Sequence, residues 1–271
     1  MNISVVIPAY NRCKLLKRAL LSVYSQTLPP AEVAVIDDGS TDGTIAMLRK
    51  EFPEVTYYRQ ENCGVSSARN LGIHHTTGDW LAFLDSDDEW LPEKLIRQAA
   101  ALDASPESKV CHTEEIWIRN GVRINPAPKY AKRGGWIFTE CLPLCAMSPS
   151  TVMIHRSIFE DIGLFDSRLP ACEDYDLWLR ITANYPVLLI EEPQIKKHAG
   201  HEDQLSQKLW GMDRFRISAL QKIIDTGQLS DENKKAAVNM LLKKAEIYLN
   251  GATKRGKTEE AFYYQQLIKR Y

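Results

Sequence analysis

A regular alternation of strand-like and helix-like segments over the first hundred residues constrains the fold more than any other feature. The strand-like segments are short apolar runs, and each is followed by a segment with helical periodicity. The runs cover residues 3–7, 33–36, 55–58 and 80–84, and the helical segments cover 14–26, 41–48, 65–73 and 92–102. Strand, helix and strand in this order predict an α/β fold with a mostly parallel sheet, right-handed crossovers and flanking helices.

The pattern changes after residue 110. Two short β-rich runs flank Asn120-Gly121, which is the strongest short signal for a hairpin. Residues 126–149 are rich in Pro, Gly and Lys, and predict a long, mobile loop. Further elements are expected at 151–155 (strand), 156–162 and 175–185 (helices) and 187–190 (strand), followed by helices at 205–225, 231–250 and 257–270. The sequence therefore predicts a main domain over 1–205 and a C-terminal helical appendage over 206–271.

Composition and charge exclude several classes of protein. The 271 residues are 44% hydrophobic and 25% charged, and no apolar run approaches the ~20 residues that span a bilayer. The chain opens on a strand-like run, so no signal peptide is expected. Six cysteines without a Cys-x-x-Cys pair indicate reduced thiols. These features predict a cytoplasmic protein, and a net charge of −1 gives no indication of nucleic-acid binding.

The charge is unevenly distributed. Residues 206–271 hold 13 Lys and Arg against 7 Asp and Glu, whereas the rest of the chain is acidic. A solvated helical face explains most such asymmetries. The alternative is contact with a partner, with another subunit or with the inner face of an anionic membrane.

Acidic residues crowd the end of the fourth apolar run, in Asp85-Ser86-Asp87-Asp88. Carboxylates repel one another, and a hard divalent cation such as Mg²⁺ or Mn²⁺ explains why they gather here, because it prefers oxygen ligands shared with substrate phosphates. Ligands of open α/β sheets also collect beyond the carboxyl ends of the strands. The alternative is a solvated loop in which Asp87 or Asp88 caps the next helix.

Two further loops should lie at the same sheet edge. The first, Pro8-Ala9-Tyr10-Asn11, contains no glycine, which argues against a phosphate-binding loop and leaves flat apolar surface for a base; the alternative is a rigid turn. The second begins with Asp37-Asp38. A carboxylate there accepts from N3–H of uracil or thymine but repels the bare N3 of cytosine, so we assign base selection to Asp37, and loop orientation or ribose contact to Asp38. The alternative is helix capping.

The loop and helix that start at residue 62 carry small residues around a single cation. Small side chains let the helix lie close to the sheet, and Arg69 projects from its first turns. This arrangement makes Arg69 a candidate partner for a diphosphate. A plain surface arginine is the alternative.

These loops, taken in order, resemble the family 2 glycosyltransferases, which have the GT-A fold. The matching motifs are Val5-Val6-Ile7-Pro8-Ala9-Tyr10-Asn11, Asp37-Asp38-Gly39-Ser40-Thr41-Asp42, Gly64-Val65-Ser66-Ser67-Ala68-Arg69-Asn70 and Phe83-Leu84-Asp85-Ser86-Asp87-Asp88. The resemblance covers about residues 1–205. It implies a Rossmann-like sheet whose half at about 1–105 binds the nucleotide and whose half at 106–205 holds the acceptor and the catalytic group.

The resemblance also implies roles for individual residues. Pro8, Ala9, Tyr10, Asn11, Gly64, Asp85 and Ser86 are expected to bind the nucleotide, and Asp87 the metal. Glu173-Asp174 resembles the family's Glu-Asp element, in which the Asp is the catalytic base; its alternative is a charge favoured by a helix N-terminus. Glu173 and Trp178 are expected on the acceptor side. His198 is the preferred further metal ligand, with His201 in reserve and Asp85 as a second candidate.

The expected activity is inverting transfer of one hexosyl or N-acetylhexosaminyl group, with Mn²⁺ or Mg²⁺, from a nucleotide sugar. A UDP-sugar is the favoured donor, and the favoured acceptor is a saccharide or lipid-linked saccharide of the cell envelope. An inverting displacement needs one carboxylate to take the acceptor proton and no covalent intermediate. The alternatives are a sugar nucleotidyltransferase, which needs a Gly-rich first loop, and a catalytically silent binding or scaffold protein.

Overall fold

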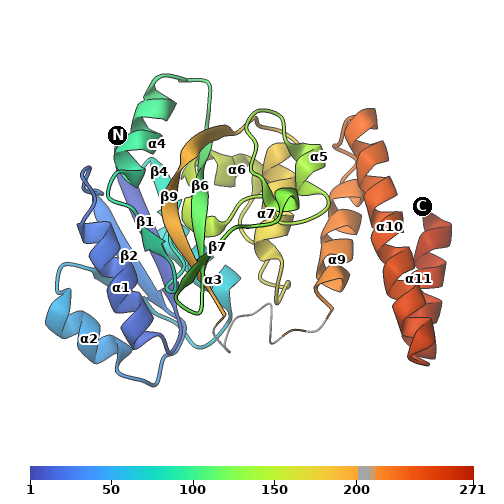
Figure 1. Ribbon diagram of the computed structural model, residues 1–271, viewed down its shortest axis with the longest axis horizontal. Helices are drawn as coiled ribbons and strands as arrows, with labels where there is room; N and C mark the ends of the chain where they lie inside the picture. Colours follow the sequence, from blue (N-terminus) through green and yellow to red (C-terminus); the bar gives the residue numbers. More distant parts are fainter. Residues whose placement is uncertain (201–208, 210) are drawn as a thin grey trace.

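A computed structural model describes residues 1–200, 209 and 211–271 and confirms the α/β fold class (Figure 1). The first half contains β1 (Ile3–Ala9), α1 (Cys13–Tyr24), β2 (Glu32–Asp37), α2 (Thr44–Glu51), β3 (Thr56–Arg59), α3 (Val65–His75), β4 (Trp80–Phe83), β5 (Glu89–Trp90) and α4 (Lys94–Asp103). The second half contains β6 (Val110–Arg119), β7 (Val122–Ile124), η1 (Pro128–Tyr130), α5 (Phe138–Cys141), η2 (Pro149–Thr151), β8 (Met153–His155), α6 (Ser157–Ile162), α7 (Glu173–Thr182) and β9 (Leu188–Ala199). Helices α9 (Met212–Asp225), α10 (Asp231–Lys254) and α11 (Thr258–Arg270) follow.

The strands of the described residues form one sheet in the order β3-β2-β1-β4-β8-β6-β9-β5, and β7 pairs with β6. Strands β1 to β4 are parallel, as expected, whereas the second half of the sheet is mixed because β8 runs antiparallel to β4 and β6. The chain builds β2 and β3 on one side of β1 and then returns to add β4 on the other side. This reversal opens a crevice at the carboxyl ends of β1 and β4, where ligands of such sheets bind.

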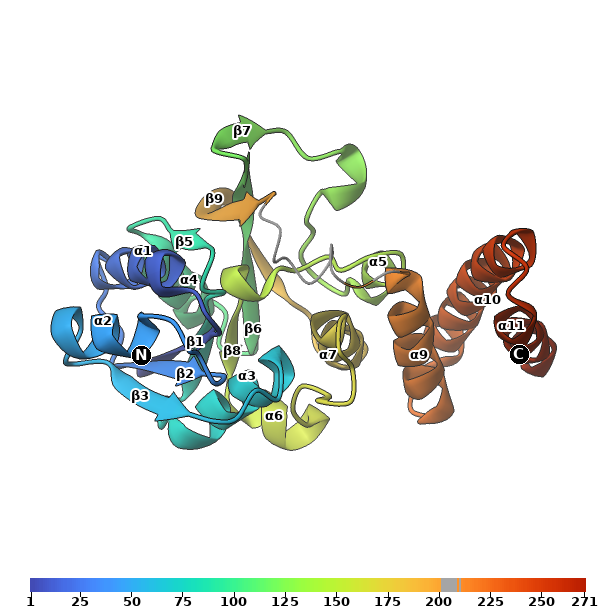
Figure 2. The ribbon, with the colours of Figure 1, turned by 90° about the horizontal axis from the view of Figure 1, so that it is seen from below.

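Helices cover both faces of the sheet. Alternate residues of β1 point to opposite faces, so Val5 and Ile7 pack with α1, α2 and α4, whereas Val6 packs with α3 and with α5 to α7. Figure 2 shows α1 and α4 on one side of the sheet and α3 and α6 on the other. Both faces are therefore buried, which explains the continuous apolar strand sequences.

Two expectations about the second half need correction. The segment 126–149 contains η1 and α5, and it buries Ile137, Phe138, Leu142 and Met147 in the core, so it is a packed segment. The last strand extends to Ala199 because β9 pairs along the whole length of β6. This places Lys196, Lys197 and His198 in a strand instead of a loop. The predicted start of the first tail helix at 205 and the boundary at 205/206 lie outside the described residues.

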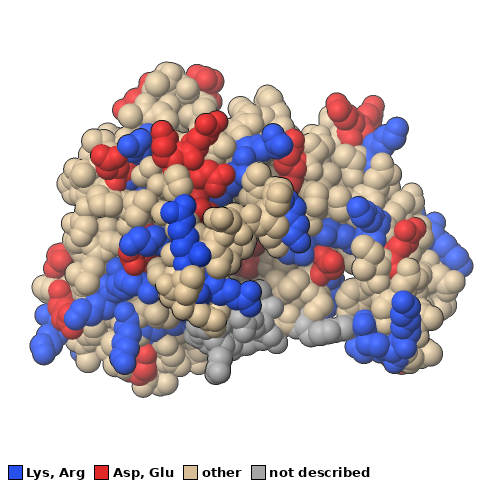
Figure 3. Space-filling view, viewed as in Figure 1, with Lys and Arg blue, Asp and Glu red and all other residues tan. Residues whose placement is uncertain are grey.

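Helices α9 to α11 share a hydrophobic cluster with α5 and α7. Helix α9 packs on α7, and α10 packs on α9, α5 and α11. Figure 3 shows Lys and Arg side chains gathered near the turn between α10 and α11, where Lys254 and Arg255 are exposed. Part of the positive charge of this region thus lies at one end of a packed helical layer. None of the helices in the described ranges is long and apolar enough to cross a lipid bilayer.

Lys94 makes stability depend on pH. It is 0% exposed, donates to Gln98 Oε1 at 2.7 Å and lies 4.0 Å from the centre of the Trp90 ring. Burial lowers its pKa from 10.5 to about 7. Between these values the unfolded chain binds a proton that the folded chain does not, so stability should rise with pH from about 7 to 10.5. Chemical unfolding at several pH values should show that Lys94→Met flattens this rise. The same substitution at the exposed Lys14 should leave it intact; an equal slope in both variants would contradict the assignment.

Candidate active site

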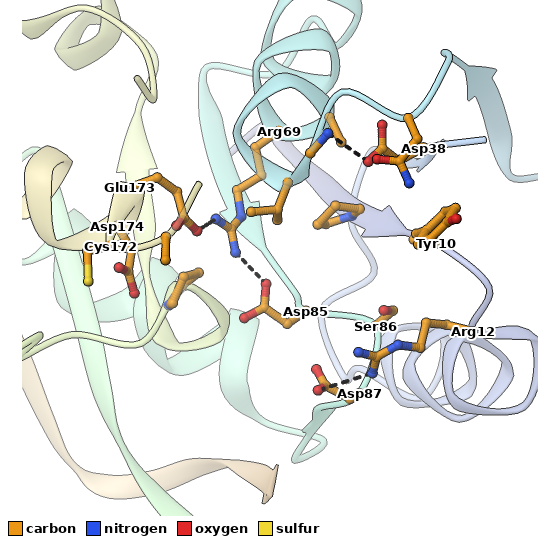
Figure 4. A pocket seen from close by; sticks show the side chains of 18 of the residues that line it. Tyr10, Arg12, Asp38, Arg69, Asp85, Ser86, Asp87, Cys172, Glu173 and Asp174 are labelled. Carbon is orange, nitrogen blue, oxygen red and sulfur yellow. Dashed lines mark hydrogen bonds and ion pairs between the residues drawn. The ribbon is translucent and has the colours of Figure 1, made fainter. Parts of the chain in front are cut away.

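A cavity of about 510 Å³ opens at the carboxyl edge of β1, β2 and β4, a size in the range of small-molecule sites. Figure 4 shows its walls, which come from the loops after these strands, from α3 and from the start of α7. The predicted site residues in the lining are Pro8, Ala9, Tyr10, Asp38, Gly64, Arg69, Asp85, Ser86, Asp87, Glu173 and Asp174. The structure adds Arg12, Asn62, Pro149, Cys172 and Met212, which the sequence analysis missed. Arg12, next to the first motif, and Asn62, at the start of the loop before α3, carried a sequence signal.

Near β1 and β2, Asp38 lines the cavity and Asp37 does not, the reverse of what the sequence analysis assigned. Asp37 is 0% exposed; its Oδ1 accepts from Ser40 N at 2.9 Å and its Oδ2 from the Tyr57 hydroxyl at 2.9 Å. It lies outside the lining, so its assignment to the base pocket is corrected. Asp38 lines the cavity instead. Its Oδ1 accepts from Gln60 Nε2 and Cys63 N, and its Oδ2 accepts from Gly64 N at 2.9 Å, which leaves one acceptor direction on Oδ2.

Local backbone geometry explains this end of the cavity. Gly64 has φ +88°, a backbone conformation that residues with a side chain rarely adopt. In this conformation its N–H donates to Asp38 just before α3 begins. Asn11 lies outside the lining: its N–H donates to Ser40 Oγ and its Oδ1 accepts from Thr41 N, both at 2.8 Å. Asn11 thus ties the first loop to the second, and its predicted direct contact with nucleotide is not supported. Tyr10 is 45% exposed at the cavity wall.

Arg69 lies between Asp85 and Glu173 in the cavity wall and forms an ion pair with each of them. Its Nη1 lies 2.6 Å from Glu173 Oε1 and its Nη2 lies 2.7 Å from Asp85 Oδ1. The side chain is 3% exposed, and its guanidinium lies 5.2 Å from the centre of the Phe165 ring. Both terminal nitrogens hold the tip of β4 to the start of α7, and the expected contact of Arg69 with a diphosphate stays a prediction.

The acidic loop contains the candidate metal ligands. Asp85 and Asp87 both line the cavity, and Arg12 Nη1 lies 3.3 Å from Asp87 Oδ2 (Figure 4). Two carboxylates completed by substrate phosphates are an ordinary ligand set for Mg²⁺ or Mn²⁺, so these residues fit such an ion. Within the described residues, no three His, Cys, Asp or Glu side chains form a complete set.

His198, the preferred histidine ligand, is not in the cavity lining. The imidazole Nε2 of His198 lies 3.6 Å from Glu89 Oε2, and burial together with the Arg18 charge lowers the His198 pKa. Its backbone N–H donates to Asp88 Oδ1 at 2.9 Å. The structure thus places His198 beside the acidic loop, as a strand residue that anchors Asp88. His201 lies outside the described residues.

Asp174 lies in the first turn of α7, at the opposite end of the lining from Tyr10 (Figure 4). Cys172 adopts a left-handed conformation (φ 61°) that ends the preceding loop, and three acidic residues follow in the first turn, where the helix dipole favours negative charge. Burial and the Asp174 charge raise the pKa of Glu173, while Arg69 opposes this rise.

Trp178 is 1% exposed and donates to the Met147 carbonyl at 2.8 Å, so it is a core residue and its placement on the acceptor side was wrong.

Removal of Arg69 should destabilise the protein strongly. Arg69→Met would leave Asp85 and Glu173 without their shared cation, and breaking a buried pair in this way costs about 3–5 kcal/mol. Arg97→Met is the matched control, because Arg97 pairs with Glu93 on the surface of α4 and such exposed pairs contribute little to stability. Urea unfolding measures both. Similar losses for the two variants would show that the bridge contributes little.

Comparison with known proteins shows the family of this chain. The family described as Glycosyl transferase family 2 matches residues 4–163. The chain is 30% identical over 193 residues to the uncharacterized glycosyltransferase YwdF of Bacillus subtilis, covering 69% of this chain and 70% of that protein. This chain therefore belongs to glycosyltransferase family 2. It is also 30% identical over 207 residues to an uncharacterized glycosyltransferase of Rickettsia typhi, covering 74% of this chain and 65% of that protein, and it spans only 26% of a relative from Rickettsia bellii.

Solved structures share the fold at lower identity. S. aureus TarS 1–349 in complex with UDP-GlcNAc has a TM-score of 0.70 at 22% identity, over 90% of this chain and 71% of that one. The mannosyltransferase PcManGT of Pyrobaculum calidifontis, in complex with GDP-Man and Mn²⁺, has a TM-score of 0.61 at 18% identity, over 99% and 83% of the two chains. The fold is thus that of GT-A glycosyltransferases. Family membership favours neither the nucleotidyltransferase nor the silent scaffold.

Proposed function

We propose that this protein transfers one sugar, of hexosyl or N-acetylhexosaminyl type, from a UDP-sugar to a hydroxyl of a saccharide or lipid-linked acceptor, with inversion. The observation that carries this proposal is the order of groups along one cavity. Tyr10 and Asp38 lie at one end, Asp85 and Asp87 come next, and Asp174 lies at the far end. A nucleotide, a diphosphate and a reacting sugar would meet these groups in that order.

Each group has a chemical role in this proposal. Tyr10 offers its ring to the base, and the remaining acceptor direction of Asp38 Oδ2 receives N3–H of uracil. Asp85 and Asp87 would hold Mn²⁺ or Mg²⁺, which neutralises the charge on the leaving diphosphate when it is bound. Asp174 accepts the proton of the acceptor hydroxyl as that oxygen attacks the anomeric carbon. A single displacement with one base inverts the configuration.

The neighbours support the donor class, because TarS binds UDP and UDP-GlcNAc and PcManGT binds GDP-Man with Mn²⁺. The division into a catalytic region over 1–205 and a helical region over 206–271 is retained as a proposal, as are a cytoplasmic location and peripheral contact of the basic turn at Lys254 and Arg255 with an anionic membrane. Synthesis of a cell-envelope polysaccharide is the proposed setting. Association of subunits through α10 and α11 is the alternative use of this surface.

Base selection tests the nucleotide end of the proposal. With Mn²⁺ present, UDP should bind at least ~10-fold more tightly than CDP, a difference of about 1.4 kcal/mol in calorimetry. Asp38→Asn should remove most of this preference, because an amide can also donate to the bare N3 of cytosine. Asp37→Asn should preserve the preference even if it lowers stability. Equal affinities for CDP and UDP in the unmodified protein would exclude Asp38 from the base pocket.

Turnover tests the class of reaction. Release of UDP from a panel of UDP-hexoses and UDP-N-acetylhexosamines, with water as a slow acceptor, should identify the donor. A nucleotidyltransferase would instead release pyrophosphate from a nucleoside triphosphate and a sugar phosphate. Nucleotide binding without turnover of any donor or triphosphate would favour the silent scaffold.

A further inference from the structure

One short segment connects the start of α7, which carries Asp174, to the acidic loop, which carries Asp85 and Asp87. Residues 142–150, which follow α5 and include the first two residues of η2, pass from the first turns of α7 to the acidic loop after β4. We call this segment the strap. Its contacts are specific hydrogen bonds at both ends, which a merely space-filling loop would not need.

At its first end the strap holds the helix that carries Asp174. The Leu142 carbonyl accepts from the Tyr175 hydroxyl at 2.7 Å, and the Met147 carbonyl accepts from Trp178 Nε1 at 2.8 Å. Between these two contacts, Cys145 Sγ lies 3.0 Å from Asp174 Oδ2. The same segment thus contacts three residues in the first turns of α7: Asp174, Tyr175 and Trp178.

At its second end the strap holds the acidic loop. Ser150 Oγ donates to Asp88 Oδ2 at 2.6 Å and accepts from Asp85 N at 3.1 Å. Ser148 Oγ accepts from Lys197 Nζ at 2.7 Å, which joins the strap to β9. The strap therefore sets the distance between the carboxylates proposed for the metal and the carboxylate proposed as the base.

We propose that Cys145 is a positioning residue that holds the Asp174 carboxylate in its reactive orientation by donating its S–H to Oδ2. This inference rests on the proposed function of Asp174 as the general base. The other oxygen, Oδ1, accepts from Tyr175 N at 2.7 Å, so the two donors together fix the rotation of the carboxylate. Oδ2 keeps a second acceptor direction for the proton of the incoming hydroxyl.

The thiol is suited to this role because it stays protonated. Burial, and then the charge and hydrogen bond of Asp174, raise the pKa of Cys145 well above its usual value. The Met147 carbonyl, at 3.2 Å from Sγ, competes for the same hydrogen, and the charged carboxylate is the stronger acceptor. Other titratable or charged groups surround the pair: Lys197 from β9, Cys141 from α5, Cys172 and Glu173 at the start of α7, and Arg216 from α9.

The kinetic test uses three variants and the donor found by UDP release. Cys145→Ala removes the S–H donor that orients the Asp174 carboxylate, so kcat should fall roughly 10-fold while the KM for the sugar donor stays unchanged. Cys145→Ser keeps a donor and should restore most of kcat. Cys141→Ala, a buried thiol four residues earlier, should lower stability without lowering kcat. UDP affinity should be unchanged in all three. A kcat of Cys145→Ala that matches the unmodified protein would overturn the proposal.

A chemical test needs no substrate. Alkylation of Cys145 by iodoacetamide at pH 8, followed by peptide mass spectrometry, should be at least about threefold faster in Asp174→Asn, because the neighbouring negative charge no longer opposes the thiolate. The alkylation rate of Cys141 should not change. An unchanged rate at Cys145 would refute the contact. If Asp174→Asn retains turnover, the proposed base fails; if it loses turnover while Cys145→Ala behaves normally, only the role of Cys145 fails.

Discussion

Replacement of Asp174 by Asn should lower turnover by roughly 10²–10⁴-fold, the range expected for loss of a general base. The amide keeps the size of the side chain and its contact with Tyr175 N, but it cannot accept the acceptor's proton. Because Asp174 lies at the opposite end of the cavity from Tyr10 and Asp38, UDP affinity should stay within about twofold. Steady-state kinetics and calorimetry measure the two effects separately.

The control for this prediction is Asp103→Asn, an exposed aspartate at the end of α4, which should behave like the unmodified protein. The product should also carry the opposite anomeric configuration to the donor, since one base and one displacement leave no route to retention. Near-normal turnover of Asp174→Asn would contradict the assignment. An anomeric NMR coupling that shows retained configuration would contradict the single displacement.

Removal of the metal should have an effect of comparable size. EDTA should stop transfer, and Mn²⁺ should restore it at least as well as Mg²⁺. Asp87→Ala should abolish most of the activity, because the ion that neutralises the leaving diphosphate loses a carboxylate ligand. Titration of Mn²⁺ into the UDP complex should show weaker binding by the variant, independently of turnover.

Stability separates this effect from damage to the fold. Asp87→Ala should lose less stability in urea than Arg69→Met, because Asp87 pairs with Arg12 at the cavity wall, whereas Arg69 bridges two carboxylates. Glu93→Ala on the surface of α4 is the matched loss of a carboxylate, and it should leave metal affinity unchanged. Full activity in the presence of chelator would refute the metal assignment.

The sequence was sufficient for much of the fold because local signals specify it. Hydrophobic periodicity located the strands β1 to β4 and their helices, and Asn120-Gly121 located the β6–β7 hairpin. The loops that line the cavity follow from one rule, that parallel strands present their carboxyl ends at one sheet edge. The packed state of 126–149 was missed because Pro and Gly dominate its composition, while its few apolar residues contact helices distant in the sequence.

Side-chain direction and long-range pairing explain the errors at the site. Asp37 ends β2 and Asp38 follows it, so a shift of one residue decides which carboxylate turns inward toward Tyr57 and which enters the cavity. Trp178 lies one turn after Asp174 on the same face of α7, and the sequence does not reveal that the strap covers this face. Arg69 forms an ion pair with Glu173, which lies 104 positions later in the chain, and no local sequence pattern predicts such a pair.

The position of α9 limits how this chain can be divided into working fragments. Met212 lines the cavity, and Ile217 and Leu220 of the same helix are buried in the cluster that contains Trp178 of α7. A cut at 205/206, the boundary expected from the sequence, would remove one wall of the cavity and expose the apolar back of the helix that carries Asp174. A fragment intended for screening inhibitors of this enzyme therefore has to retain the helical layer, even though no sequence motif of the family lies within it.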